Sequence, residues 1–378
     1  MKQKRSEIAA RYIARIVFGL MCVVLMINIL APDKATSQAE NRSLQTFPKF
    51  DSEDVLSGQF SQELNNYVSD QFVGRDSLIH IRYLLNKLTG VKKINDVYLG
   101  NGTLIQENSA INEEQMNRNI NAINNFCINH QVRSGFLLAP NAANIQLDNL
   151  PAYSNTIDQD AQMDQIFSML DTSITQIDVR DTLDKHKDEY LYYHTDHHWT
   201  SLATFYAFQQ LASSFELGGS KKNQTILYIK SVIILKELWQ KKVGSVGIQD
   251  DIEIYVSDNI KDYVMMDESN GTRTCSIYNS KGLESSNPYD VFLGGNTGLV
   301  QIENLNDSDR HLLLIKDSYA NSMVQFLLPY YRTITIVDPR YFYEDIERIF
   351  NLNLITDVLF LYNTNTFVQD TSIADVLE

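Results

Sequence analysis

The chain begins with basic residues followed by an apolar segment. Lysines and arginines precede Ile16–Ala31, which only one glycine and one asparagine interrupt. A helix of these residues, about 16 in number, would be roughly 24 Å long, slightly short of a hydrocarbon core of about 30 Å. Extension back through Tyr12, with Arg15 reaching the lipid headgroups, makes a membrane span feasible. The pattern predicts an uncleaved anchor within residues 1–34, with its basic start in the cytoplasm.

Two other interpretations of this segment stay open. It could be a secretory signal peptide, for which Ser37–Ala39 is a weak and distant cleavage site, or a buried helix of a cytosolic fold. On the anchor interpretation, residues 35–57 are a polar linker and residues 58–378 are the extracytoplasmic domain of a single-pass cell-membrane protein. Cleavage would make the same domain secreted.

Beyond the linker, helical and strand patterns alternate. The expected helices are 58–72, Asp76–Lys87, Asn112–Asn129, Ala161–Leu170, Ser201–Ser214, Tyr319–Leu328, Phe342–Ile349 and a last C-terminal helix. The expected strands are a hairpin over Asp96–Gln106, then Gly135–Pro140, Ile174–Val179, His311–Ser318, Thr333–Asp338 and Asp357–Tyr362. Short apolar strands that alternate with helices predict an α/β fold with a buried parallel sheet and helices on both faces. Ligands of such sheets bind at the carboxyl ends of the strands.

Composition narrows the function. The 378 residues carry a net charge of −15, and the only dense basic cluster lies at the N-terminus, so nucleic acid is not expected as a partner. One of the three cysteines falls in the apolar run, which leaves at most one disulfide, and no Cys/His metal spacing is present. No cofactor is predicted.

The first group of chemically active residues is YYHTDHHWT, Tyr192–Thr200, which holds three of the seven histidines. In an extended or turn conformation, Asp196 and His198 leave the backbone on the same side. The carboxylate can then accept from one ring nitrogen and leave the other free to act as a base. Trp199 would form a bulky wall beside the ring and is a candidate substrate-binding residue.

Two other roles compete for these histidines. Imidazole and carboxylate groups from His194, Asp196, His197 and His198 could hold a transition metal, although the HExxH spacing is absent. The histidines could also simply cap and pack at a helix start.

The second group is LLLIKDSYANS, Leu312–Ser322. Ser318 is expected where an apolar strand turns into a helix, and backbone N–H groups at a helix start favour negative charge. That geometry suits a nucleophile and an oxyanion. The competing interpretation is that Asp317 or Ser318 is an N-cap and nothing more.

A third element is FLGGNTG, Phe292–Gly298. Its glycines would let backbone approach a ligand at Gly295, and Asn296 could donate a side-chain N–H to an oxyanion. A hairpin turn explains the same letters.

DHHW at Asp196–Trp199, followed by KDSYAN at Lys316–Asn321, resembles the bacterial DHHW protein family, which is similar to the SGNH-hydrolase-like domain of the alginate O-acetyltransferases. Further matching stretches are ENRSLQTFPKF (Glu40–Phe50), SGQFSQELNNYVSDQFVGRD (Ser57–Asp76), VYLGNGTLIQ (Val97–Gln106) and YDVFLGGNTG (Tyr289–Gly298). The resemblance covers roughly residues 39–215 and 249–365. Residues 217–248 depart from it, and we treat them as an insertion or a compensated frameshift.

The resemblance implies a flavodoxin-like SGNH core in which the Asp-x-His element precedes the serine. On the family pattern, Ser318 would be the nucleophile, His198 the general base and Asp196 its orienting partner. His197 takes the variable position, and Lys316 stands where the SGNH "GDS" has glycine.

Three functions follow as hypotheses. The first is a serine-dependent O-acyltransferase, most simply an acetyltransferase, or an esterase, acting on a cell-wall or exported polysaccharide with acyl groups from a membrane partner. The second is a non-catalytic protein that binds or assembles polysaccharide on a hydrolase-like scaffold. The third is a metal-dependent hydrolase.

Overall fold

The structure is a computed structural model that describes residues 2–34, 36–37, 42–50, 52–217, 228–235, 250–257, 262–285, 287–352 and 354–378. Two compact units divide these residues, one ending at Thr89 and one beginning at Gly90. The first unit contains α1 (Lys2–Leu30), β1 (Thr36–Ser37), β2 (Arg42–Ser43), α2 (Ser52–Ser57), α3 (Gln59–Asp70) and α4 (Arg75–Leu88).

The first unit contains the expected N-terminal helix. Within α1, the 20 residues Arg11–Leu30 are long and apolar enough to cross a membrane, and their side chains are mostly exposed. Twenty helical residues span about 30 Å, the thickness of a hydrocarbon core. Helices α3 and α4 agree with the helical periodicity of the sequence. The proposed boundaries of anchor, linker and extracytoplasmic domain stay predictions, as does the cleavage of this segment.

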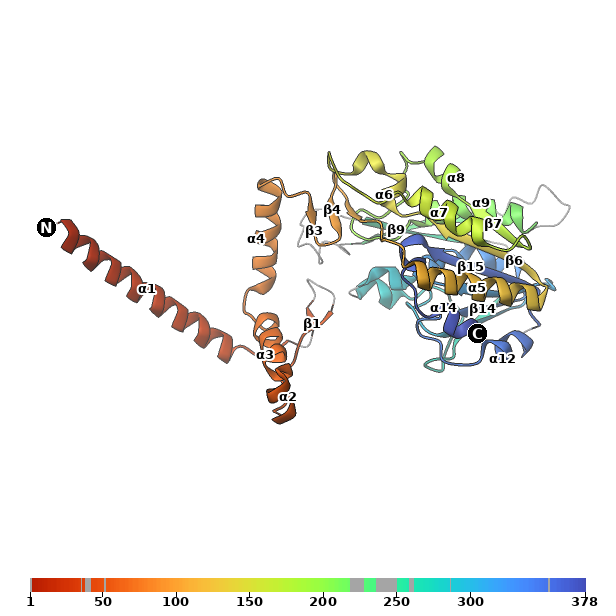
Figure 1. The fold of residues 1–378 in the computed structure, drawn as a ribbon. Helices are drawn as coiled ribbons and strands as arrows, with labels where there is room; N and C mark the ends of the chain where they lie inside the picture. The colour runs from red at the N-terminus through yellow and green to blue at the C-terminus, as the bar shows by residue number, and fades with distance from the viewer. Residues whose placement is uncertain are drawn as a thin grey trace. The chain divides into compact units, whose positions relative to one another are not determined.

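The second unit is a mixed α/β fold (Figure 1). Its strands are β3 (Lys93–Ile94), β4 (Val97–Leu99), β5 (Leu104–Gln106), β6 (Arg133–Ala139), β7 (Ile174–Asp178), β8 (Tyr228–Leu235), β9 (Asp250–Ser257), β10 (Tyr263–Asp267), β11 (Thr272–Thr274), β12 (Leu299–Asn304), β13 (His311–Lys316), β14 (Thr333–Val337) and β15 (Asp357–Asn363). Its α-helices are α5 (Glu113–His130), α6 (Ala142–Ile145), α7 (Gln159–Met169), α8 (Arg180–Lys185), α9 (Ser201–Ser214), α11 (Val324–Leu327), α12 (Ile346–Leu352), α13 (Thr364–Phe367) and α14 (Ile373–Leu377). Short 3₁₀ helices are η1 (Leu147–Asn149), η2 (Ser280–Glu284), η3 (Pro288–Val291), η4 (Ser318–Ser322) and η5 (Leu328–Tyr330).

The main sheet has eight strands in the order β11-β10-β12-β14-β13-β15-β6-β7. The five strands from β14 to β7 are parallel, and β12, β10 and β11 extend the β14 edge in antiparallel pairings. The parallel strands can be numbered 1 to 5 as β13, β14, β15, β6 and β7. Their order across the sheet is then 2-1-3-4-5, which is the flavodoxin-like order. The switch point of that order lies between β13 and β15, so a ligand is expected at the carboxyl end of β13.

Alternating side chains of the central strands pack into two cores. On β13, Leu312 and Leu314 face a core with α8, α9 and α11, whereas Leu313 and Ile315 face one with α5, α7, α12 and α14. Because successive side chains of a strand point to opposite faces, a wholly apolar strand must be covered on both. The predicted α/β class, with a mostly parallel sheet between helices, is confirmed.

The expected helix Tyr319–Leu328 is broken into η4, α11 and η5. Asp317 accepts a hydrogen bond from the backbone N–H of Tyr319, and the Gln325 side chain donates to the Ser322 carbonyl. The Asp317 bond caps the helix start. A continuous helix would pair the Ser322 carbonyl with the N–H of Phe326, which here donates to the Met323 carbonyl, so the Gln325 bond competes with the helix. The expected helix Phe342–Ile349 begins only at Ile346, because Asp345 caps α12 by accepting from the N–H groups of Glu347 and Arg348.

Two other expectations meet the structure in part. The hairpin is confirmed, since β4 and β5 pair antiparallel and Gly102 has a φ of 80° at the turn. Of residues 217–248, the structure describes Leu217 and β8, which pairs with β9, and the remainder of that stretch lies outside the described residues. Cys127 and Cys275 are both free thiols.

A close approach of β6 to the end of α9 supplies a test of the packing. A Cβ at Gly135 would lie 2.6 Å from the Phe215 ring. Gly135→Ala is therefore expected to lower the free energy of unfolding by about 1–3 kcal/mol, the usual cost of overpacking. In urea denaturation, the Gly135→Ala/Phe215→Leu double variant should lose less stability than the sum of the two single losses, because the ring that clashes is gone. Additive losses would contradict the packing.

Candidate active site

The Tyr192–Thr200 segment forms a closed loop before α9. Tyr192 and Trp199 form an antiparallel bridge, and the N–H of Tyr193 donates to the carbonyl of His198 over 3.2 Å. Thr200 then caps α9 by accepting from the N–H of Ala203. The loop thus carries Asp196 and His198 at its turn, anchored on both sides by backbone hydrogen bonds.

Within the loop, Asp196 holds the His198 ring. Its Oδ1 accepts from the backbone N–H of His198 over 2.8 Å and lies 2.6 Å from His198 Nδ1. The opposite ring nitrogen, Nε2, lies 2.8 Å from the hydroxyl oxygen of Ser318. All three residues are buried. Their distances fall within the 2.6–3.2 Å reach that a base needs toward a nucleophile.

Ser318 lies at the carboxyl end of β13, at the switch point of the sheet. The capping role that competes for this position belongs to Asp317, whose carboxylate accepts from the N–H groups of Tyr319 and Asn363, each over 2.9 Å. The Ser318 hydroxyl is left to face His198. Because η4 has only five residues, a long helix dipole at this point is absent from the described structure.

Further contacts fasten the loop onto η4. The indole N–H of Trp199 donates to the Tyr319 carbonyl over 2.9 Å, and the Tyr319 hydroxyl donates to the carbonyl of His197. Trp199 is 0 % exposed, so it braces these two segments and does not border open space. The Tyr289 ring stacks on His198, with centroids 3.8 Å apart and planes 8° from parallel. Its hydroxyl donates to the Ser322 hydroxyl over 3.0 Å.

The surroundings shift the charge states of the pair. Burial lowers the pKa of His198 to about 4, helped by His197 and opposed by Asp196. Burial by itself would raise the pKa of Asp196, but the two imidazoles, His198 first, hold that pKa well below its ordinary value. At neutral pH, His198 is therefore a neutral imidazole beside the ionised Asp196 carboxylate. In this state one ring nitrogen of His198 can accept a proton.

The Phe292–Gly298 segment contacts β13 and η4, the two elements that flank Ser318. The Asn296 side-chain oxygen accepts from the Asn321 amide of η4 over 3.2 Å and from Lys316 Nζ over 3.0 Å. Gly295, with a φ of 106°, already donates its N–H to the carbonyl of Phe292. The structure thus brings Asn296 into contact with Lys316 and Asn321, on either side of Ser318 in the chain, and pairs the Gly295 N–H with Phe292.

The family model of the DHHW protein matches residues 110–337, which include both the Asp196 loop and Ser318. The chain belongs to the DHHW protein family. The expected resemblance is therefore confirmed, while no curated protein matches the sequence.

Two solved structures share the fold of this DHHW chain, and a third is more distantly similar. A DHHW family protein from Eubacterium siraeum is 21 % identical, with 74 % of this chain and 97 % of that chain covered and a TM-score of 0.61. Bacillus cereus PatB1 with a sulfonyl adduct is also 21 % identical, with the same coverage and a TM-score of 0.62. The O-acetyltransferase domain of Pseudomonas putida AlgJ is 12 % identical, with 74 % and 94 % covered and a TM-score of 0.47.

The metal interpretation meets one group of ligands in the described part of this DHHW chain. Ligand atoms of Asp196, His197 and His198 lie within 4.8 Å of one another. His197 Nδ1 is 3.1 Å from Asp196 Oδ1, but both ring nitrogens of His198 already face Asp196 and Ser318. His194 lies instead 3.3 Å from Asp250. A metal would have to displace the hydrogen bond between His198 and either Asp196 or Ser318.

Sequence reasoning did not identify Tyr289 or Lys316 as parts of this DHHW site. Tyr289 is 91 positions from the ring that it covers, and no local spacing signals such a contact. In the sequence, Lys316 stands out only as a departure from the glycine of the SGNH pattern. A lysine inside an otherwise apolar strand was an available signal, because a buried ammonium needs a partner.

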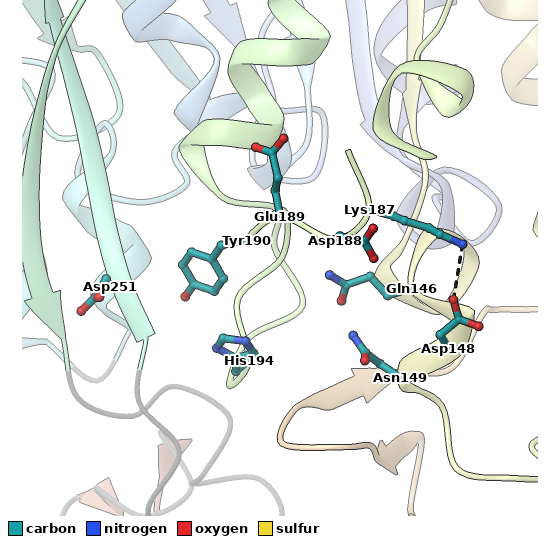
Figure 2. A pocket seen from close by; sticks show the side chains of 9 residues that line it. All are labelled: Gln146, Asp148, Asn149, Lys187, Asp188, Glu189, Tyr190, His194 and Asp251. Atoms are coloured by element: carbon teal, nitrogen blue, oxygen red, sulfur yellow. Dashed lines mark hydrogen bonds and ion pairs between the residues drawn. The ribbon is translucent and has the colours of Figure 1, made fainter. Parts of the chain in front are cut away.

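A polar pocket opens beside the same loop of this DHHW chain (Figure 2). It has a volume of about 470 Å³, and His194 and Tyr190 border it together with Asp251. The other lining residues are Gln146, Asp148, Asn149, Lys187, Asp188 and Glu189. Its lining therefore offers amide, carboxylate, ammonium and imidazole groups to a ligand.

The lowered pKa of His198 can be measured directly. In NMR titrations of histidine-labelled protein, its midpoint is expected well below the ordinary 6.5, near 4. Asp196→Asn should lower that midpoint further, because the carboxylate favours the protonated ring. A midpoint at or above 6.5, or a rise in the Asp196→Asn variant, would contradict the described environment.

Proposed function

We propose that this protein is an extracytoplasmic O-acyltransferase or esterase, with acetyl as its simplest acyl group and a carbohydrate as its acceptor. The observation that carries the proposal is the contact of 2.8 Å between His198 Nε2 and the Ser318 hydroxyl, with Asp196 on the other ring nitrogen. This is the arrangement of a nucleophile, its base and the group that orients the base.

In the first half-reaction, the Ser318 oxygen attacks the carbonyl carbon of a donor ester while His198 Nε2 takes the hydroxyl proton. The tetrahedral oxyanion collapses, the bond to the donor's alkoxy group breaks, and His198 returns the proton to that leaving oxygen. In the second half, a sugar hydroxyl or water gives its proton to His198 and attacks the acyl-serine. His198 then reprotonates Ser318, and the product is a new ester or a free acid.

Two donors are available for the oxyanion. Among the described residues, neither the backbone N–H of Ser318 nor the Asn296 Nδ2 group has a hydrogen-bond acceptor, while the N–H groups of Tyr319 and Gly295 are occupied. We assign oxyanion stabilisation to these two groups. A donor aimed at the developing charge commonly contributes about 10²–10³ in rate.

A hydroxyl-rich acceptor suits the surroundings of the site. The pocket beside the loop, about 470 Å³ in volume, combines the amides of Gln146 and Asn149 with carboxylates and the Tyr190 ring. His194, on its wall, is four positions from His198, a distance of at most about 14 Å even in an extended chain. One sugar unit could occupy the pocket while a neighbouring unit presents its hydroxyl to Ser318. The carboxylates outnumber Lys187, which favours a neutral or cationic glycan.

The membrane enters the proposal through α1. A span over Arg11–Leu30 would tether the enzyme at the outer surface, where a membrane partner that carries acyl groups across the bilayer could supply the donor. We place transfer ahead of hydrolysis for this reason and because of the resemblance to the alginate O-acetyltransferases.

The serine mechanism is tested with an aryl acetate as donor. Ser318→Ala should lower turnover by at least about 10³-fold, because the nucleophile is lost. The matched control is Ser280→Ala, an exposed serine outside the site, which should keep wild-type turnover. A sulfonyl fluoride, chosen because PatB1 was solved with a sulfonyl adduct, should modify the wild type and the control but not Ser318→Ala.

The other outcomes of the same assay separate the alternatives. Loss of turnover on chelation, with Ser318→Ala still active, would support the metal-dependent hydrolase. Glycan binding without turnover by the wild type would support the assembly protein and end the serine proposal.

The anchor is tested by fractionating cells that express the full chain. The protein is expected in the membrane fraction, and deletion of residues 2–34 should leave it soluble, because an apolar helix of about 20 residues partitions into lipid. A mature N-terminus beyond Ala31 in the secreted fraction would identify a cleaved signal peptide instead.

A further inference from the structure

Lys316 is a buried charge two positions before Ser318. Its side chain is 2 % exposed, and Nζ lies 3.1 Å from Asp338 Oδ2 and 3.0 Å from the side-chain oxygen of Asn296. Arg340 in turn donates to both oxygens of Asp338, over 2.8 and 2.7 Å. A continuous set of hydrogen bonds therefore runs from Arg340 through Asp338 and Lys316 to Asn296.

Stability alone is a poor explanation for this lysine. Burying an ammonium is costly because it loses its hydration, and well-packed apolar residues of similar volume often replace buried ion pairs without loss of stability. Burial lowers the pKa of Lys316 and the pairing with Asp338 opposes that shift, so the site holds a charge at some cost. An ammonium is positively charged and can only donate hydrogen bonds, whereas a methionine of similar length offers neither property.

The ammonium determines which end of the Asn296 amide faces Lys316. An amide has one acceptor end and one donor end, whereas a lysine ammonium only donates. Only the oxygen of Asn296 can therefore face Lys316 favourably, and the Asn321 amide contacts that same oxygen. The Nδ2 group must then point away from both, where it has no acceptor among the described residues. A positive charge on the oxygen side also polarises the amide and strengthens its N–H groups as donors.

Asn321, which contacts the Asn296 oxygen, lies on the side of its helix that carries the nucleophile. Ser318 and Asn321 are at positions i and i+3 of a 3₁₀ helix, and side chains at that spacing lie on the same side of the helix. Asn296, bonded to Asn321, is therefore held on the side of η4 that carries the Ser318 hydroxyl.

We propose that Lys316 is a positioning residue that fixes the Asn296 amide with its N–H end toward the oxyanion formed at Ser318. This inference rests on the proposed function, since it concerns the oxyanion donor of that reaction. Asp338 and Arg340 hold the ammonium in place, and Lys316 itself does not contact the reacting atoms.

The test is a double-mutant cycle measured on the full chain with an aryl acetate. Asn296→Ala should lower kcat about 10²-fold with little change in KM, because an oxyanion donor acts in the transition state. Lys316→Met should lower kcat at least tenfold. If Lys316 acts through Asn296, the double variant should be no slower than Asn296→Ala alone.

Lys316→Gln provides the conservative rescue, because its amide can still donate to the Asn296 oxygen. It should recover part of the kcat lost in Lys316→Met, and it replaces Lys316→Met in the cycle if that variant does not unfold cooperatively. An unchanged kcat in the lysine variants, or losses that multiply in the double variant, would overturn the positioning role. Turnover that survives Ser318→Ala would instead overturn the proposed function, so the two failures are distinguishable.

Discussion

The site depends on the docking of one loop onto one turn, across 120 positions of sequence. His198 meets Ser318, the Trp199 indole donates to the Tyr319 carbonyl, and Thr204 and Ser322 share a hydroxyl contact of 2.9 Å. These groups are buried, and an unpaired polar group in such a place costs about 1–3 kcal/mol. The loop and η4 therefore supply hydrogen-bond partners to each other. Buried alone, either segment would leave polar groups without partners.

The sheet determines where this docking occurs. The parallel strands have the flavodoxin-like order when counted from β13, so the switch point falls where Ser318 follows that strand. At that edge the chain turns away on opposite sides of the sheet, which leaves room for the loop before α9. A polar cluster is tolerated there because the apolar cores on the two faces supply the stability of the unit.

Burial and charge work together at the same edge. The His198 imidazole is neutral at neutral pH, because burial lowers its pKa, and the Tyr289 ring covers it next to a carboxylate that keeps its charge. Two positions before Ser318, Lys316 is kept in the interior by Asp338 and faces the side-chain oxygen of Asn296. In both places a buried charged group sets the orientation of a neutral one, which is how a site is preorganised without a ligand.

By itself, the sequence determined the elements and the chemistry on offer. Periodicity identified the five parallel strands β6, β7, β13, β14 and β15. The Asp-x-His spacing identified a carboxylate able to hold an imidazole. Both signals depend only on neighbours in the chain. It could not show that Asp317 is the cap and Ser318 is not, that the helix after Ser318 is broken, or that Trp199 is wholly buried. Nor could it place Tyr289 on His198 or Lys316 against Asn296. Those contacts join residues far apart in the chain, and only tertiary packing decides which distant donors and acceptors meet.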